Sequence, residues 1–427
     1  MLNSRKGFTL VELIVVMAVF TVVIMIAGDS FKTILNQMGK ITKSEESNIE
    51  GVLGLEMFRH DLQQAGYGLP FSYLAPITYY EAGYAPASAY NDGTGTTASG
   101  VPRAIVAGDT LAATTASDGT DSYNILAGTD YLALKGATLG LTKAAQNWTY
   151  MPYSSGITGK KKPRIWQKDN LANTDRVIVL KKTFSGSTYT NQLIFNTAHP
   201  ETYWANYNSG GFADTSFNPT LPEEMYYIYG ISADDNVGMP FNRADYFVAS
   251  PADSTKKPSY CSPDSGGVPT TGILYKGSLN HSSSAPGGHL TYIPLLDCVA
   301  DMQVVFGWDV DDGQGSEGQD GVVETFSTPL ASGGAITVSP AGNMGRVTSA
   351  LADPEKLRNS LKVVKVYVLA QVGRRDANYQ SPATFEIGDP TLDNSISKTF
   401  TLSAAMRNYH WKVYRLIVRP KNLLTNQ

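Results

Sequence analysis

Residues 1–29 read MLNSRKGFTLVELIVVMAVFTVVIMIAGD, and this stretch decides how the rest of the chain is placed. A short leader carries Arg5 and Lys6, and the 21 residues 8–28 that follow it contain one ionisable side chain, Glu12. A helix of about 20 apolar residues crosses the hydrocarbon core of a bilayer. We therefore expect residues 8–28 to span a membrane, and the two cations before them predict a cytoplasmic N-terminus.

Glu12 is out of place in an ordinary membrane helix. A carboxylate in an apolar span costs roughly 2.5 to 3.5 kcal/mol on insertion scales unless a partner compensates for it. Cleavage between Gly7 and Phe8 would create an α-amino group one helical turn from Glu12, on the same chain or on a neighbouring copy. Glu12 therefore indicates a cleaved leader and a charge pair with the new amine.

The run KGFTLVELIVVMAVF resembles the type III signal sequence of type IV prepilins and type II secretion pseudopilins. The resemblance implies that an inner-membrane aspartyl peptidase cuts after Gly7 and that the amine of Phe8 is then N-methylated. It also implies that Glu12 aligns each incoming subunit with the amine of the previous one. The matched segment is short, but the order Gly-Phe-Thr-Leu-x-Glu before an apolar run is specific.

Two other interpretations of this segment compete with the prepilin signal. A secretory signal peptide would also place cations before an apolar stretch and could end at Ala27-Gly28, but Glu12 and the missing A-x-A site argue against it. A plain uncleaved anchor has no use for Glu12.

The helix is predicted to continue beyond the apolar span. Residues 30–65 contain no proline, and an apolar stripe at three- and four-residue steps runs along residues 49–62 through Ile49, Val52, Leu55, Phe58 and Leu62. The glycine-rich run at residues 66–70 is a strong stop. We expect residues 29–66 to be the periplasmic half of one long helix. Many major pilins have a proline just past the membrane segment, whereas this chain has Gly28, where we place any bending or melting.

The remaining residues, 67–427, predict a β-rich head. Residues 78–121 are rich in small and polar residues and are expected to be a long loop or insertion. Short β-branched and aromatic runs bounded by turn residues then predict a mainly antiparallel sheet, so the fold class is α+β. The expected strands are 131–135, 176–181, 192–195, 225–231, 246–249, 273–276, 290–293, 296–307, 363–371, 399–403 and 410–419.

Several of these segments resemble one group of minor pilins. Residues 56–69 are similar to the D-[IL]-x-x-A-G-Y-G segment that closes the helix in PilW-type proteins, and residues 296–307 and 410–420 are similar to strands of that group. The resemblance implies a low-copy subunit that helps initiate a type IV pilus and lies at or near its tip. Its partners would be other minor and major pilins, prepilin peptidase and the inner-membrane assembly platform. The chain would be a single-pass inner-membrane protein with a periplasmic head until it enters the pilus.

Alternatives to this function come from the same chemistry and from other classes. A minor pseudopilin of a type II secretion system shares the N-terminal chemistry. The head could instead be a pilus-tip adhesin or a membrane-tethered hydrolase. The surplus of tyrosine and tryptophan could form a sugar- or protein-binding surface, although sheet packing explains it as well.

The two cysteines, Cys261 and Cys298, have 36 residues between them. In an oxidising compartment they could form one disulfide, worth about 3 to 4 kcal/mol by loop-entropy arithmetic. The alternative is two unrelated buried thiols, because spacing does not establish connectivity. The absence of C-x-x-C excludes a thioredoxin-like redox motif.

An acidic, glycine-rich stretch follows the strand expected at 296–307. Asp309, Asp311, Asp312 and Asp320 could wrap Ca²⁺, which takes 6 to 8 oxygen ligands and tolerates irregular loops. The stretch departs from an EF-hand because Gly313 holds the fifth position and no glutamate holds the twelfth. A solvated acidic hairpin is the alternative.

Charge and motifs exclude other function classes. The net charge is −4 and would be −6 without Arg5 and Lys6, which leaves no basic stripe to bind nucleic acid. The chain lacks G-x-S-x-G, H-E-x-x-H and a phosphate loop, and its five histidines show no ligand spacing. We therefore expect a structural protein rather than an enzyme, with no catalytic residues.

Overall fold

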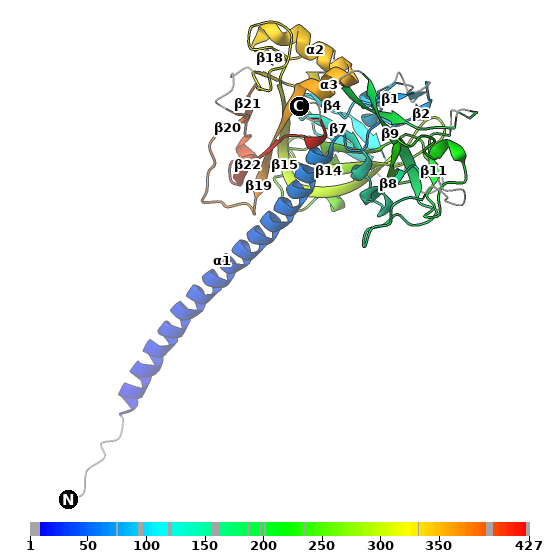
Figure 1. Cartoon of the computed structure of the whole chain (residues 1–427). Helices are drawn as coiled ribbons and strands as arrows, with labels where there is room; N and C mark the ends of the chain where they lie inside the picture. The colour runs from blue at the N-terminus through cyan, green and yellow to red at the C-terminus, as the bar shows by residue number, and fades with distance from the viewer. Residues whose placement is uncertain are drawn as a thin grey trace, which may run out of the picture.

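The computed structural model describes residues 9–73, 76–92, 97–98, 100–117, 122–154, 162–185, 188–196, 198–199, 202–233, 236–331, 333–389 and 396–423. One helix, α1 (Leu10–Gln64), extends from a large β-rich head (Figure 1). At 1.5 Å per residue its 55 residues span about 83 Å. The strands pair almost entirely antiparallel, so the predicted α+β class, with a long N-terminal helix and a β-rich head, is confirmed.

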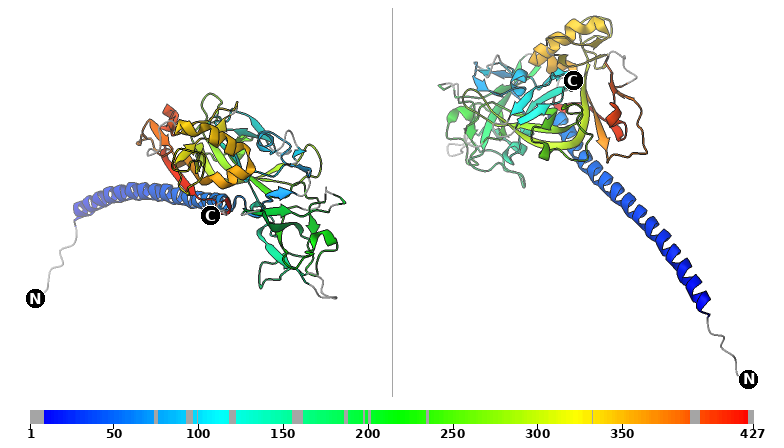
Figure 2. Two further views of the ribbon diagram at one scale, coloured as in Figure 1. Left: turned by 45° about the horizontal axis from the view of Figure 1, so that its top comes forward. Right: turned by 180° about the vertical axis from the view of Figure 1, so that it is seen from behind.

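Helix α1 is unbroken, and it passes through Gly28 without a kink. The expectation of local melting at Gly28 is therefore wrong. Glycine costs only about 1 kcal/mol in a helix, and the surrounding apolar residues keep the backbone hydrogen bonds intact. The curvature of α1 is instead spread along its length (Figure 2).

The helix ends where the glycine-rich run predicted. Ala65 is the C-cap, and Gly66 and Gly68 have φ values of +83° and +65°. Such left-handed backbone suits glycine and turns the chain away from the helix axis. The chain thereby enters the head directly from α1.

The last turns of α1 contact the head through part of the predicted stripe. Leu55, Phe58 and Leu62 are buried, and the Phe58 ring stacks on Tyr246 with centroids 3.9 Å apart. Val52, by contrast, is 51% exposed, so its expected place on the buried face is wrong. The side chain of Ile49 lies outside the described residues. At the level of Val52 the helix contacts the sheet through the glycines Gly51 and Gly54 instead.

A buried ion pair fastens the end of α1 to the head. Lys276 Nζ lies 2.5 Å from Asp61 Oδ2, and the Tyr246 hydroxyl donates a hydrogen bond to the same oxygen. The side chains of Asp61 and Lys276 are 5% and 6% exposed. Removing one member of such a pair leaves an uncompensated buried charge, so this contact fixes how the helix meets the sheet.

The main sheet has 12 strands among the described residues. Eight of them follow the order β17-β4-β7-β13-β14-β15-β16-β18. Strand β19 also pairs with β15 and is followed by β22, and β6 pairs with β13 and is followed by β5. All its pairs are antiparallel except β17 with β4. Its strands are β4 (Ile105–Asp109), β5 (Thr115–Ser117), β6 (Ser122–Ile125), β7 (Tyr131–Gly136), β13 (Asn242–Pro251), β14 (Gly272–Leu279), β15 (Leu290–Trp308), β16 (Thr325–Ser327), β17 (Leu330–Ala331), β18 (Val338–Ser339), β19 (Leu361–Val372) and β22 (His410–Val418).

A second sheet of six strands forms a separate lobe of the head, with the order β1-β10-β9-β12-β8 and with β11 paired to β9. Its strands are β1 (Ser72–Tyr73), β8 (Trp148–Pro152), β9 (Arg176–Ser185), β10 (Thr188–Leu193), β11 (Ala205–Asn206) and β12 (Met225–Gly230). The two remaining hairpins are β2 (Tyr79–Tyr80) with β3 (Thr97–Ala98) and β20 (Thr384–Ile387) with β21 (Lys398–Thr401).

Two short helices of the described chain, α2 (Met344–Ala352) and α3 (Pro354–Ser360), lie near β18 and β4 at the top of the head in Figure 1. Asp353 caps α3 by accepting hydrogen bonds from the N–H groups of Glu355 and Lys356. Single turns of 3₁₀ helix lie at Ala87–Tyr90, Ala137–Leu139, Ala144–Gln146, Thr215–Phe217, Ser254–Lys256, Ala341–Asn343, Ala404–Met406 and Lys421–Leu423.

The expected strands fall on observed strands, with two differences. The runs 290–293 and 296–307 form one strand, β15, which crosses Pro294 with register shifts instead of turning back. The run 192–195 overlaps only the end of β10, because pairing with β9 begins at Thr188. A proline in a sheet is tolerated at such an irregularity, so the two expected strands join across Pro294.

Residues 78–121 are more ordered than predicted. The described part of this segment contains β2 to β5, and β4 joins the main sheet beside β7. It also supplies Glu81 to a fully buried ionic network, in which Glu81 Oε2 lies 2.7 Å from Lys135 Nζ and 2.9 Å from Arg243 Nη1. The segment is thus a long insertion that is held on the sheet by buried charges, which no short-range pattern reveals.

Candidate functional site

The N-terminus of α1 is organised around Thr9 and Glu12. The Glu12 backbone N–H donates to the Thr9 hydroxyl oxygen at 3.3 Å, and the Thr9 N–H donates to Glu12 Oε2 at 2.9 Å. This is a capping box, which satisfies two helix N–H groups that otherwise lack partners. The T-x-x-E order in the sequence is its signature, so Glu12 has a local role in the helix cap besides the predicted charge pair with an amine.

The capping box leaves half of the Glu12 carboxylate available. Both of its hydrogen bonds, from the Thr9 N–H and the Thr9 hydroxyl, end on Oε2. Within the described part of the chain no group donates to Oε1. A carboxylate has about four acceptor positions, so Glu12 can cap its own helix and still accept a hydrogen bond from an external amine.

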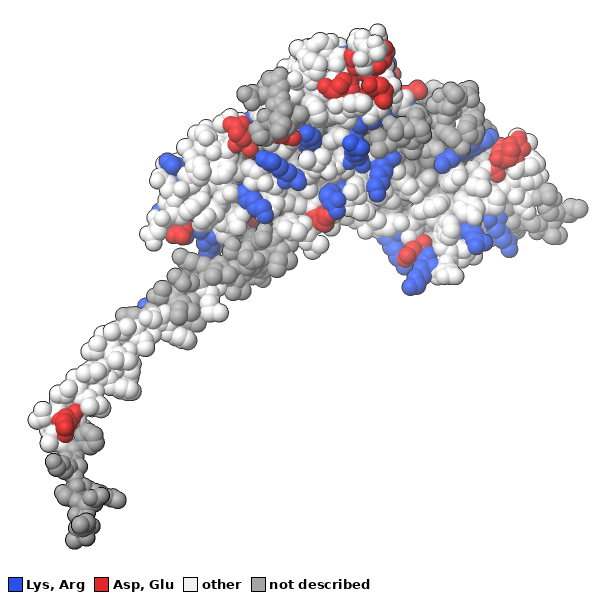
Figure 3. Space-filling model, turned by 60° about the vertical axis from the view of Figure 1, so that its left-hand side comes forward, with Lys and Arg blue, Asp and Glu red and all other residues white. Residues whose placement is uncertain are grey.

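The apolar segment of α1 that follows this site, as far as the structure describes it, makes no contact with the head. Leu10–Lys32, 23 residues, is long and apolar enough to cross a membrane, and none of it is buried against the head. Figure 3 shows its described surface as largely uncharged, with acidic atoms near the N-terminal end. Such a surface in water would be unfavourable, so this segment is a candidate membrane anchor or signal.

Residues 2–28 match the prokaryotic N-terminal methylation motif. The chain thus begins with a type IV pilin-like prepilin signal. The motif contains the predicted cleavage residues Gly7 and Phe8, which lie outside the described residues, and Glu12, which lies at the capping box. No curated protein and no solved structure matches the chain.

The motif suggests a member of the type IV pilin or pseudopilin family. It includes Thr9 and Glu12, the two residues of the capping box. Methylation requires a free α-amine, and the predicted new amine at Phe8 would directly precede Thr9. The prepilin-like signal and the capping box occupy the same residues.

The acidic stretch expected to bind Ca²⁺ folds as a turn in which the four aspartates separate into two groups. Asp311 Oδ2 lies 2.7 Å from Arg346 Nη1, and Asp312 Oδ1 accepts the N–H groups of Gln314 and Ser316. The N–H of Gly315 and then the Arg346 guanidinium hold the pKa of Asp311 below its usual range. Asp311 and Asp312 shape the turn rather than point to a common centre.

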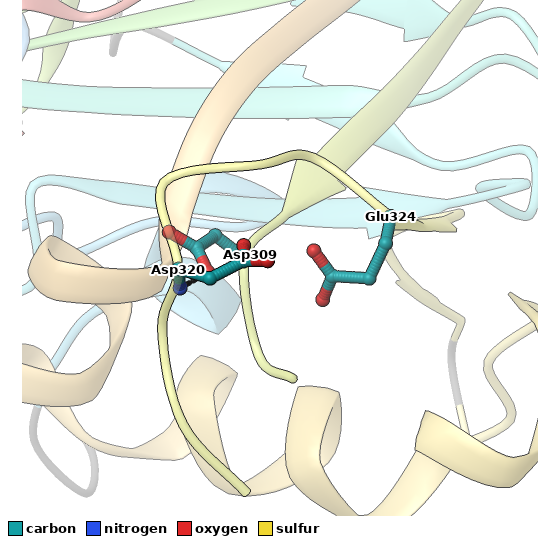
Figure 4. Close-up of side chains that lie close together, drawn as sticks. All are labelled: Asp309, Asp320 and Glu324. Carbon is teal, nitrogen blue, oxygen red and sulfur yellow. Dashed lines mark hydrogen bonds between the residues drawn. The ribbon is translucent and has the colours of Figure 1, made fainter. Parts of the chain in front are cut away.

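Asp309 and Asp320 instead come together with Glu324, which sequence reasoning missed. Carboxylate oxygens of these three residues lie within 4.8 Å of one another. Figure 4 shows the three side chains close together in the loop. Asp309 is fully buried, accepts the N–H groups of Asp320 and Gly321, and lies 3.5 Å from Lys362 Nζ. These three carboxylates could hold a hard cation, but Lys362 already supplies a positive charge there.

Glu324 could not have been assigned to this cluster from spacing. It lies 15 positions after Asp309, and the loop returns because Glu324 Oε1 accepts the N–H groups of Val310 and Asp311 at 2.8 and 3.0 Å. Its other oxygen is buried without a hydrogen-bond partner among the described residues. Of the four aspartates predicted as calcium ligands, the structure brings together Asp309 and Asp320 and adds Glu324 to them, while Asp311 and Asp312 lie outside this cluster.

Cys261 and Cys298 form a disulfide with Cα atoms 5.1 Å apart. Cys298 lies in β15, and Cys261 lies in the loop between β13 and β14. Nearby, Gln371 of β19 accepts the N–H of Ser262 and donates to the carbonyl of Tyr260. The disulfide thus closes this long loop onto the sheet.

Proposed function

We propose that this chain is a minor pilin-like subunit of a type IV pilus, a structural component that helps initiate assembly and lies at or near the filament tip. The observation that carries the proposal is the coincidence of the methylation motif with a helix cap whose glutamate keeps one oxygen free. Peptidase cleavage after Gly7 frees the amine of Phe8, which is methylated and pairs with Glu12 of an adjoining subunit. The mechanism is non-enzymatic.

The proposed placement follows from the two halves of the molecule. The apolar part of α1 spans the inner membrane before assembly and packs with other pilin helices afterwards, while the head stays in the periplasm. In the part of the chain that the structure describes, the head comprises two large sheets and two further strand pairs, all joined to the end of α1. Its bulk favours a low-copy position at the end of a thin filament over repetition along the shaft.

The test follows wild type and two variants of the full chain in cells with their native partner subunits. Wild type is expected to yield an N-terminus that begins with methylated Phe8 and to appear in sheared filaments by quantitative mass spectrometry. Glu12→Gln keeps a side-chain oxygen that can accept the hydrogen bond from the Thr9 N–H, but it removes the negative charge. Incorporation of this variant into filaments should therefore fall about tenfold or more. Glu56→Gln, which changes an exposed glutamate on the same helix, should incorporate normally.

Two results would count against the proposal: an intact leader on the membrane-extracted protein, or normal incorporation of Glu12→Gln. A deletion strain separates the nearest alternative. Loss of pili and of twitching motility supports the pilus assignment, whereas loss of secretion with intact pili assigns the chain to a type II secretion pseudopilus.

A further inference from the structure

The second sheet carries a row of aromatic side chains on one face. Tyr227 and Tyr229 of β12 lie directly opposite Tyr150 and Trp148 of β8, and residues two apart on a strand share a face. Trp148, Tyr150 and Tyr227 remain partly exposed. Trp148 and Tyr227 pack partly against the main core, and the ring area that the core leaves uncovered forms, with Tyr150, an exposed aromatic surface on this part of the sheet.

Trp166, from the segment after β8, enlarges this surface. Its ring centroid lies 5.5 Å from that of Trp148 and 5.8 Å from that of Tyr150, and both contacts are edge-on. The two indole planes meet at 60°. Together the rings form the walls of an angled corner.

The position of Trp166 is held by hydrogen bonds. Its indole N–H donates to the carbonyl of Trp148 at 2.9 Å, and its backbone N–H and carbonyl both bond the side-chain amide of Asn170, at 2.7 and 2.8 Å. A ring fixed in this way loses little conformational freedom when a ligand covers it.

The corner opens into a shallow hollow of about 270 Å³. Its remaining lining includes the exposed side chains of Gln146, Lys168 and Asp169, which offer donors and acceptors around the rings. The charges of Lys168 and Asp169 are opposite, so the rim has no net attraction for an ion. The volume lies just below the roughly 300–1,000 Å³ of pockets that enclose a drug-sized molecule.

We propose that the hollow between Trp148 and Trp166 binds a neutral oligosaccharide, with a pyranose ring stacked on an indole. The C–H face of such a ring packs on an aromatic plane, while its hydroxyl groups exchange hydrogen bonds with a polar rim. An apolar ligand would need a more enclosed cavity than this one. The combination of flat rings, mixed polar groups and no net charge therefore matches a neutral sugar.

The location leaves this surface free of the helix. In both views of Figure 2 the lobe that contains β8 lies on the other side of the head from the N-terminal length of α1. The proposal does not depend on the filament role, since a sugar could bind whether or not the chain is assembled.

The experiment titrates the full chain, in a zwitterionic detergent without a sugar headgroup, with cellotetraose, maltotetraose and β-1,4-galactotetraose. Tryptophan fluorescence and calorimetry should show saturable binding of at least one, with Kd between about 10 μM and 1 mM. Trp166→Ala should weaken it about tenfold or more, and Trp166→Phe less. Tyr84→Ala, a change of another exposed ring on the head, should leave it unaltered.

A thermal melt of each variant guards against a folding defect at Trp166. A second variant, Lys168→Ala with Asp169→Ala, changes only exposed rim groups and should weaken binding several-fold. The proposal is overturned if none of the three sugars binds up to about 10 mM, or if Trp166→Ala binds as tightly as wild type. It is equally overturned if the Trp166 change abolishes capture of another pilin-like subunit while wild type binds no sugar, since the surface would then be a protein contact.

Discussion

The carboxylate of Glu324 lies inside the acidic loop beside that of Asp309. Burial raises the pKa of Glu324 above its usual range, and the negative charge of Asp309 adds to this shift. The N–H groups of Val310 and Asp311, which donate to Glu324, act in the opposite direction without cancelling it. The ionised form of Glu324 is therefore less favourable in the folded protein than in the unfolded chain.

We expect Glu324→Gln to stabilise the protein at neutral pH. Because the folded-state pKa is raised, the contribution of Glu324 to stability is greatest below its unfolded value and falls as the pH rises through the raised value. In the presence of a chelator, the melting temperature of the variant should lie about 1 to 2 °C above that of wild type at pH 7. At pH 4 the two melting temperatures should be the same. An equal difference at both pH values would contradict the assignment.

The same pair of proteins tests the calcium hypothesis. A cation held by Asp309, Asp320 and Glu324 would neutralise their repulsion, so Ca²⁺ would raise the melting temperature of wild type and not of Glu324→Gln. Asp312→Asn, which alters only the turn, would keep the response. Identical melting of wild type with Ca²⁺ and with chelator removes the hypothesis.

At the scale of elements, the contact between α1 and β15 depends on glycine. A Cβ atom at Gly54 would lie 2.1 Å from the Leu295 carbonyl oxygen, and one at Gly51 would lie 2.5 Å from a side-chain carbon of Leu296. The absent side chains let the helix backbone approach the strand closely, just where Pro294 and the register shifts bend β15. These two glycines therefore serve packing.

Gly54→Ala should therefore destabilise the protein despite the better helix propensity of alanine. The clash is with backbone, which cannot move aside without shifting the helix, and overpacking typically costs about 1 to 3 kcal/mol. Gly28→Ala is the matched control, because no atom lies within 4 Å of its added Cβ and it gains about 1 kcal/mol of propensity. Thermal melts in detergent should move in opposite directions; a stabilised Gly54→Ala would show that the helix and β15 are not in contact.

At the scale of the whole molecule, the head is assembled from segments far apart in the chain. Strand β15 connects β14, β16 and β19, contacts α1, and carries Cys298. The disulfide to Cys261 ties the loop between β13 and β14 to this central strand. Its loss should therefore weaken the head as a whole.

We expect the double change Cys261→Ser and Cys298→Ser to cost about 3 to 4 kcal/mol, the loop-entropy value for a closed loop of this size. The melting temperature should fall by several degrees. A reducing agent should lower the melting temperature of wild type to that of the variant and leave the variant unchanged. If full reduction left the melting temperature of wild type unchanged, the hydrogen bonds to Gln371, and not the disulfide, would stabilise the loop.

Much of the architecture could be predicted because its causes are local. The apolar span, the apolar stripe and the glycine stop each act within a few residues, so the length of α1 followed from them directly. Most strands followed from β-branched and aromatic runs in the same way. The ionic network around Glu81 was missed, since no short-range pattern announces a charge that will be buried beside Lys135 and Arg243.

By itself, the sequence of the first 28 residues determined the prepilin-like signal, because the methylation motif and the helix cap are each contained in neighbouring residues. Only the tertiary structure decided which carboxylates cluster with Asp309, why Gly54 is a glycine, and that Trp148 and Trp166 share a hollow. Each of these depends on strand register and loop closure between distant residues, where a shift of one position would turn every side chain to the other face.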